Sequence, residues 1–72
     1  MTAAKTLQVP RLLSIAQVAD HLGVHPKTVG RLIKDGQIPI HRIRGQVRIS
    51  EADLAAYLVQ SRVYPRANYL DQ

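Results

Sequence analysis

The 72-residue sequence contains no cysteine. It therefore has no disulfide bond, no thiol nucleophile and no cysteine-ligated zinc site, and packing alone must hold the chain together. Long hydrophobic runs are missing too. None approaches the roughly 18 residues that a membrane-spanning helix requires, and residues 1–10 lack the apolar segment of a secretory signal. We expect a cytoplasmic protein with one small domain and no additional catalytic module.

Acidic residues are scarce in the middle of the chain. Six of the ten Lys and Arg residues lie between His25 and Arg48, against the single acid Asp35. The whole sequence carries a formal net charge of +5 and has a pI of about 10.3. Such a balance favours a polyanionic partner, either nucleic acid or an anionic membrane surface.

Two short helices joined by a glycine turn are predicted from the apolar spacing. Ser14 is a suitable N-cap, and Gly23 ends the first helix. The positions at i, i+3, i+4 and i+7 that line its buried face are Ile15, Val18, Ala19 and Leu22. The second helix starts at Pro26 and ends before Gly36, and its buried stripe is Val29, Leu32 and Ile33.

The outer face of this second helix is basic. Lys27, Gly30, Arg31 and Lys34 recur there at helical spacing. A charged stripe of this kind is by default the solvated face of an amphipathic helix. Gly30 is either a tolerated defect or a position where the backbone must approach a ligand closely.

From Ile40 the pattern changes to the alternation of a two-stranded hairpin. We expect Ile43, Val47 and Ile49 to face inward and Arg42, Arg44 and Arg48 to face outward, with Gly45-Gln46 at the reversal. Arginines on such a hairpin can protect an edge strand against aggregation. This role is compatible with contact between the same arginines and a polyanion.

A third helix is predicted to follow the hairpin. Ser50 and Asp53 give a signal like a capping box. The apolar stripe is Leu54, Tyr57 and Leu58, and the helix should end near residues 60–62. An enzyme is not expected, because two of the three serines, Ser14 and Ser50, serve as caps, and Glu51 and Asp53 flank a helix start rather than a cleft.

These elements predict a mainly α fold with a small β-hairpin, a winged helix-turn-helix. The predicted divisions are a flexible arm at residues 1–10, the domain at residues 11–62 and a tail at residues 63–72. A second helix of this type can enter the major groove of double-stranded DNA. Its first turns, with Lys27, Thr28 and Arg31, are the part expected to reach bases, whereas Lys34 and the wing residues Arg42, Arg44, Gly45, Gln46 and Arg48 are expected near the DNA backbone or minor groove.

Several runs along the chain carry a family resemblance. They are Leu13–Ala19, Leu22-Gly23-Val24, Thr28-Val29, Arg31-Leu32-Ile33, Asp35–Pro39, Arg48-Ile49 and Asp53-Leu54. Together, from about Leu12 to Arg62, they resemble the excisionase-type, MerR-like winged helix-turn-helix family. The sequence departs from the family pattern at His25, where a serine cap is common, and at Gly30, where an aromatic residue is frequent.

The resemblance implies two related functions. One is that of an excisionase, a recombination directionality factor that bends DNA and directs an integrase toward excision of a mobile element. The other is that of a small AlpA-like transcriptional regulator. Implied partners are double-stranded DNA, an integrase and further copies of the chain bound cooperatively at adjacent sites. From a different class, a protein-interaction module with a basic face would also fit the charge pattern.

No metal or other cofactor is expected. The three histidines His21, His25 and His41 invite a zinc hypothesis, but Gly23 interrupts the helix between the first two. Their i, i+4 spacing therefore does not put them on one face.

Overall fold

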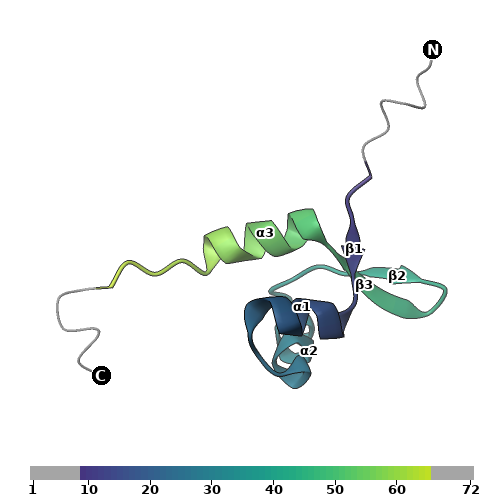
Figure 1. The fold of residues 1–72 in the computed structure, drawn as a ribbon, viewed down its shortest axis with the longest axis horizontal. Helices are drawn as coiled ribbons and strands as arrows, with labels where there is room; N and C mark the ends of the chain where they lie inside the picture. The colour runs from purple at the N-terminus through teal and green to yellow at the C-terminus, as the bar shows by residue number, and fades with distance from the viewer. Residues whose placement is uncertain (1–8, 66–72) are drawn as a thin grey trace, which may run out of the picture.

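The computed structural model describes residues 9–65 (Figure 1). The elements in chain order are β1 (Leu12–Leu13), α1 (Ile15–Leu22), α2 (Pro26–Lys34), β2 (His41–Ile43), β3 (Gln46–Ser50) and α3 (Glu51–Gln60). The three strands form a sheet in the order β1-β3-β2 with antiparallel neighbours. The predicted fold class, a mainly α winged helix-turn-helix with a small hairpin, is confirmed.

Helix α1 is closed at both ends by local hydrogen bonds. The Ser14 side chain accepts from the Gln17 amide, and the Gln17 side chain accepts from the Ser14 amide, which completes a capping box. At the other end Gly23 takes a left-handed φ of 70°, and the Val24 amide donates to the Ala19 carbonyl. This arrangement satisfies carbonyls that the helix end would otherwise leave unpaired, so the turn into α2 is sharply defined.

The core is small and draws on every helix. Its buried hydrophobic members are Val18, Ala19, Val29, Ile38, Ile49 and Leu54, and half-buried hydrophobic side chains pack around them. Ile38 comes from the connection between α2 and β2, where an isolated apolar residue has no periodicity to reveal it. Tyr57 packs at the edge of this cluster, as expected from its spacing with Leu54.

The register of the hairpin corrects the predicted alternation. Ile43 pairs with Gln46, and the two-residue turn is Arg44-Gly45, not Gly45-Gln46. Directly paired residues share a face, so Ile43 lies on the same side as Gln46 rather than with Ile49. The prediction that Ile43 faces inward was therefore wrong, and 49% of its surface is exposed. A shift of one residue in a turn reverses the faces of a whole strand.

The structure differs from the sequence prediction in two further elements, which lie at the ends of the domain. β1 was not predicted, because a two-residue strand is too short to show a pattern, and it pairs Leu12 and Leu13 with the end of β3. In α3 the expected stripe included Leu58, but this side chain is 42% exposed. Beyond Tyr57 the helix projects away from the body of the fold, and within residues 9–65 its last residues are exposed (Figure 1).

The two isoleucines of the hairpin give a matched test of this register. Ile49→Ala removes a fully buried side chain and should lower the free energy of unfolding by about 3 kcal/mol. Ile43→Ala removes a half-exposed one and should lower it by less than about 1 kcal/mol. Urea unfolding followed by circular dichroism measures both, and equal losses would contradict the assigned register.

Candidate nucleic-acid interface

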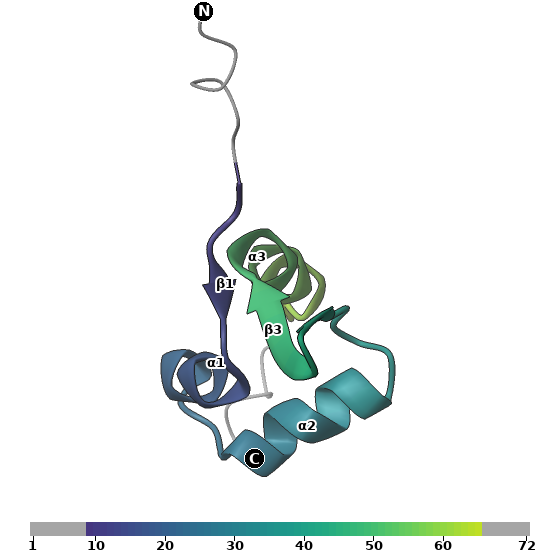
Figure 2. The same ribbon diagram turned by 90° about the vertical axis from the view of Figure 1, so that its right-hand side faces the viewer.

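Helix α2 turns one face to the core and the other to solvent. Val29 is fully buried, and Leu32 and Ile33 are half-buried against the core. On the outer face the side chains of Lys27, Arg31 and Lys34 are exposed, while Thr28 and Gly30 are half-buried. The sheet lies between α2 and α3, so α2 forms one side of the domain (Figure 2). The predicted basic stripe is thus presented on one accessible helix face.

The first turn of α2 is held by a histidine cap. His25 Nδ1 accepts a hydrogen bond from the Lys27 amide at 3.0 Å, and Pro26 occupies the first helical position. A ring nitrogen can accept only in its unprotonated state, so the cap requires neutral His25 in one tautomer. His25 therefore does cap the helix, a role that Ser or Asp more often fills with a side-chain oxygen.

Helix α2 ends as firmly as α1. Gly36 has a left-handed φ of 76°, and the Gln37 amide donates to the Leu32 carbonyl at 2.8 Å. The Gly36 amide donates to the Ile33 carbonyl. These bonds form a Schellman motif, as the position of Gly36 predicted, and they direct the chain toward Ile38 in the core.

Gly30 is not required by the packing of the protein. A Cβ placed on it would meet no heavy atom within 4 Å, and its φ is not in the left-handed region. Alanine would therefore fit, and a mid-helix glycine is less favourable than alanine by roughly 1 kcal/mol. Both sequence hypotheses, a tolerated defect and a position where a ligand approaches the helix backbone closely, agree with this open space.

The tip of the wing holds an arginine in an unusual backbone conformation. Arg44 and Gly45 connect β2 and β3, and both have positive φ, 51° and 83°. A two-residue turn with this geometry is favoured between twisted strands, and Asn or Gly usually occupies its first position. An arginine there costs roughly 1 kcal/mol, because its Cβ crowds the backbone in the left-handed region. Arg44 thus lies at the tip of the wing in a locally strained backbone conformation.

The other two wing arginines differ from Arg44 and from each other. Arg48 is half-buried, and its guanidinium donates to the Val47 carbonyl and to Gln46 Oε1, both at 2.7 Å. Arg42 is exposed and pairs with Val47, which places it on the opposite face of the hairpin from Arg48. The alternation placed all three on one outward face, and this was wrong: Arg48 braces the wing, whereas Arg42 and Arg44 extend into solvent.

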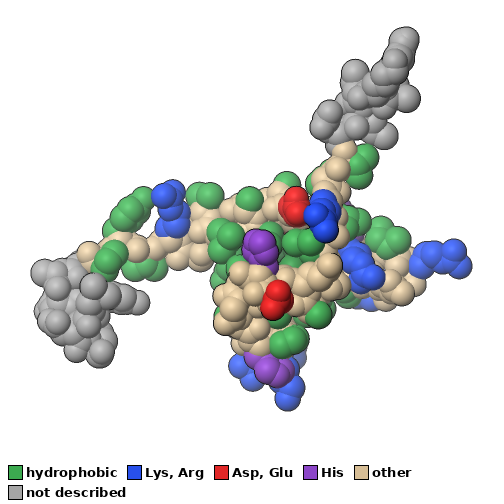
Figure 3. Space-filling model, in the orientation of Figure 1, with side chains coloured by type: hydrophobic (Ala, Val, Ile, Leu, Met, Phe, Trp, Pro, Cys, Tyr) green, Lys and Arg blue, Asp and Glu red, His purple; other side chains and the backbone are tan. Residues whose placement is uncertain are grey.

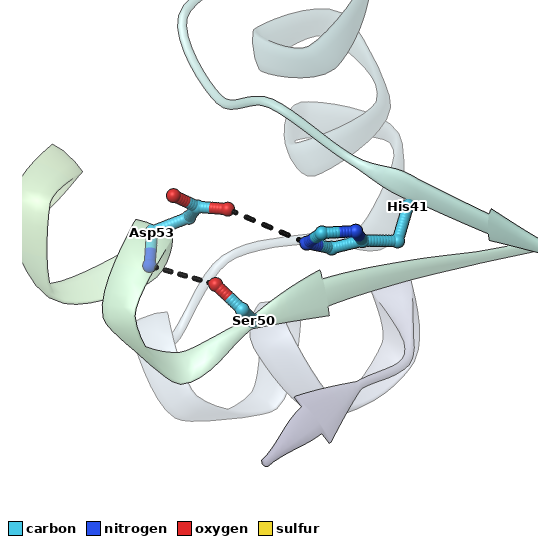
Figure 4. Close-up of polar contacts among 3 residues, drawn as sticks. All are labelled: His41, Ser50 and Asp53. Atoms are coloured by element: carbon cyan, nitrogen blue, oxygen red, sulfur yellow. Dashed lines mark hydrogen bonds and ion pairs between the residues drawn. The ribbon is translucent and has the colours of Figure 1, made fainter. Parts of the chain in front are cut away.

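A polar contact joins the wing to α3 (Figure 4). Ser50, the last residue of β3, accepts the Asp53 amide and caps α3. The Asp53 carboxylate lies 3.9 Å from His41 Nε2 on β2, an ion pair when the imidazole is protonated. Both side chains are partly exposed, so the contact contributes little stability.

The basic side chains are spread over the surfaces that project from the core. Figure 3 shows Lys and Arg side chains at the α2 end of the molecule and out to the tip of the wing. Across residues 9–65 no group of three His, Cys, Asp or Glu side chains is arranged to hold a metal ion. In the same part of the chain, no helix has the length and apolar character needed to cross a membrane.

One comparison with known protein families gives a match. Residues 12–62 match the family described as "Helix-turn-helix domain". The matched range runs from β1 to two residues past α3 and contains both α2 and the wing. No curated protein matches the sequence significantly.

The strain at the wing tip leads to a prediction with opposite effects on stability and binding. Arg44→Asn should raise the free energy of unfolding by about 0.5–1 kcal/mol, because Asn adopts positive φ more readily. The same change removes a positive charge at the wing tip, so affinity for duplex DNA should fall and the slope of log affinity against log salt should become shallower by about 1.

Arg42→Asn is the matched control. It removes the same charge from an exposed site of the same wing without relieving any positive φ, so it should weaken DNA binding and leave stability unchanged. Denaturation curves and fluorescence anisotropy with a labelled duplex measure the two effects. A stability gain of equal size in both variants would show that the backbone at Arg44 is not strained.

Proposed function

Because the chain belongs to this helix-turn-helix family, we propose that it binds double-stranded DNA with α2 in the major groove and the wing beside it. The main support is the division of α2 into a buried apolar face and an exposed basic face. A helix docks in the major groove by such an outward face, while its inner face anchors it to the domain.

Within this proposal the basic residues have different roles. Arg31 stands on the exposed face of α2, within the first turns, and a guanidinium can make two hydrogen bonds to a guanine edge. Lys27 and Thr28 lie at the start of the same helix, close to where bases and phosphates meet. Lys34, Arg42 and Arg44 are exposed and suited to phosphates, whereas Arg48 shapes the wing with Gln46.

We further propose that the chain acts as an excisionase that bends DNA and directs an integrase toward excision. A single module of this size covers roughly 600–1,000 Å² of protein surface on DNA, which gives limited affinity. Cooperative binding of several copies to adjacent sites, and contact with the integrase, would supply the remainder. The alternative role of an AlpA-like transcriptional regulator uses the same DNA-binding surface.

Substitution of Arg31 tests the base-reading role. Arg31→Ala should cost about 1–3 kcal/mol of binding free energy on a preferred duplex and relax discrimination at one base position. Lys34→Ala is the control on the same helix face, and it should weaken all sequences alike. Anisotropy titrations on a duplex selected from a random library, and on its single-base variants, measure both.

The salt dependence of the same titrations tests the class of function. With about four basic residues at phosphates, namely Lys27, Lys34, Arg42 and Arg44, log affinity should fall with log salt at a slope of roughly −4. A protein-interaction module would bind duplexes without sequence preference and be displaced by any polyanion. A slope near zero for the selected duplex would contradict the DNA-binding proposal.

An excision assay separates the two DNA-linked roles. The chain is expressed with the integrase of the same mobile element, and the excised junction is quantified by PCR while transcripts from the flanking promoters are measured. An excisionase should raise the junction signal at least tenfold, and Arg31→Ala should abolish the increase. A change in transcripts with no change in excision would favour the regulator.

A further inference from the structure

One face of the wing carries an exposed apolar side chain next to the tip. Ile43 is the last residue of β2, pairs with Gln46 of β3 and directly precedes the turn residue Arg44. It is 49% exposed and does not belong to the hydrophobic cluster that forms the core of residues 9–65. A β-branched residue favours the strand conformation, but threonine would do so without exposing apolar surface. The packing of the described domain therefore gives no reason for an isoleucine at this position.

The neighbour of Ile43 on this face is held in one orientation. Gln46 Oε1 accepts a hydrogen bond from the Arg48 guanidinium at 2.7 Å. Because residues two apart on a strand share a face, Arg48 fixes Gln46 from the side of the wing base. The amide oxygen is thus used within the wing, and the NH2 group is left as a donor on an exposed side chain. Ile43 and Gln46 together present an apolar group beside an amide donor.

Positive charge surrounds this pair of side chains. Arg44 follows Ile43 at the tip, Arg42 precedes it on the other face of the hairpin, and both arginines are exposed. Residues 41–50 contain no Asp or Glu. The wing tip therefore suits a narrow groove with anionic walls and hydrogen-bond acceptors on its floor. The minor groove of A·T-rich DNA has this chemistry, because phosphates line both sides and adenine N3 and thymine O2 are acceptors.

We propose that Ile43 is a wedge that enters the minor groove and partly separates two stacked base pairs, while the Gln46 NH2 group donates to a base edge beside it. The inference rests on the DNA binding proposed above and adds a residue that deforms the duplex. Minor-groove proteins often insert an apolar side chain such as Ile or Leu between base pairs, which kinks the duplex by roughly 20–90° toward the major groove. Arg42 and Arg44 then lie at the phosphates on either side.

The wedge predicts which base step lies under the wing. Partial unstacking costs least at TA and CA/TG steps, and of these only TA has acceptors alone on the minor-groove floor. We therefore expect a TA step at this place in preferred duplexes. Such a preference comes from deformability and groove chemistry, and it is independent of the contacts of Arg31 in the major groove.

Fluorescence of the bound duplex tests the wedge. 2-Aminopurine replaces adenines one at a time in the selected duplex, and dyes at its two ends report the bend by energy transfer. The wild-type chain should raise the 2-aminopurine signal at one step by roughly twofold or more, because unstacking relieves quenching, and should shorten the end-to-end distance. Ile43→Thr keeps the β-branched shape without the apolar bulk, so both signals should be lost while affinity falls by less than about tenfold. Ile43→Leu keeps an apolar wedge and should retain both signals.

Val59→Thr is the matched control. Val59 is 62% exposed on α3, outside the wing, so the same kind of exchange there should leave both signals unchanged. If Ile43→Thr retains the unstacking and the bend, or if the wild-type chain binds and produces neither, the wedge is overturned while DNA binding stands. A wild-type chain that does not bind the duplex at all contradicts the proposed function, and the wedge with it.

Base analogues test whether the contact lies in the minor groove. Replacing the A·T pairs of the unstacked step by G·C should weaken binding by about tenfold, because the guanine N2 amino group occupies the floor where Gln46 donates. An inosine·C pair has the major-groove edge of G·C without this amino group, so it should restore most of the affinity. If inosine·C binds as weakly as G·C, the step is read from the major groove and the proposed contact is wrong.

Discussion

The surface features of this domain depend on one small core. Val18 and Ala19 of α1 pack with Val29 of α2, with Ile38 and Ile49, and with Leu54 of α3. In a chain of this size only about 60% of the unfolded surface becomes buried, so each of these side chains carries a large share of the stability. Because the core uses one face of each element, the opposite faces of α1, α2 and α3 are available for charged or apolar contacts without disturbing it.

Much of the fold could be predicted from two kinds of residue. Apolar positions at helical spacing predicted α1, α2 and the start of α3, and Gly23 and Gly36 marked helix ends because a left-handed residue is needed there. The hairpin turn was displaced by one residue, because Arg44 occupies a position where Asn or Gly is usual and Gly45-Gln46 looked like the better turn. The exposure of Leu58 depends on where α3 projects, which periodicity within a helix does not encode.

The candidate site was predicted as a set of charges, and the structure distinguishes them. Helical spacing was enough to place Lys27, Arg31 and Lys34 on one exposed face. It could not show that the Arg48 guanidinium donates hydrogen bonds to Val47 and Gln46, because those bonds depend on strand register and on the rotamer of a long side chain. It also missed that His25 caps α2 through a ring nitrogen, although its place before Pro26 marked the cap position.

Several of the less stable local choices lie in α2 and the wing, the elements proposed to contact DNA. α2 begins with a histidine cap and carries Gly30 with open space around it, and the wing tip holds Arg44 at positive φ. Both helices have a glycine end, but at its start α1 has a full capping box, which α2 lacks. Strained backbone positions cluster at functional sites, so Arg44 at positive φ agrees with a functional wing tip, although natural chains also carry weak positions that have no function. If α2 and the wing are completed by contact with a duplex, part of the binding free energy is used to order them, and a site on DNA that fits poorly leaves them loose. Discrimination between sequences would then rest on the stability of α2 as well as on the contacts made by Arg31.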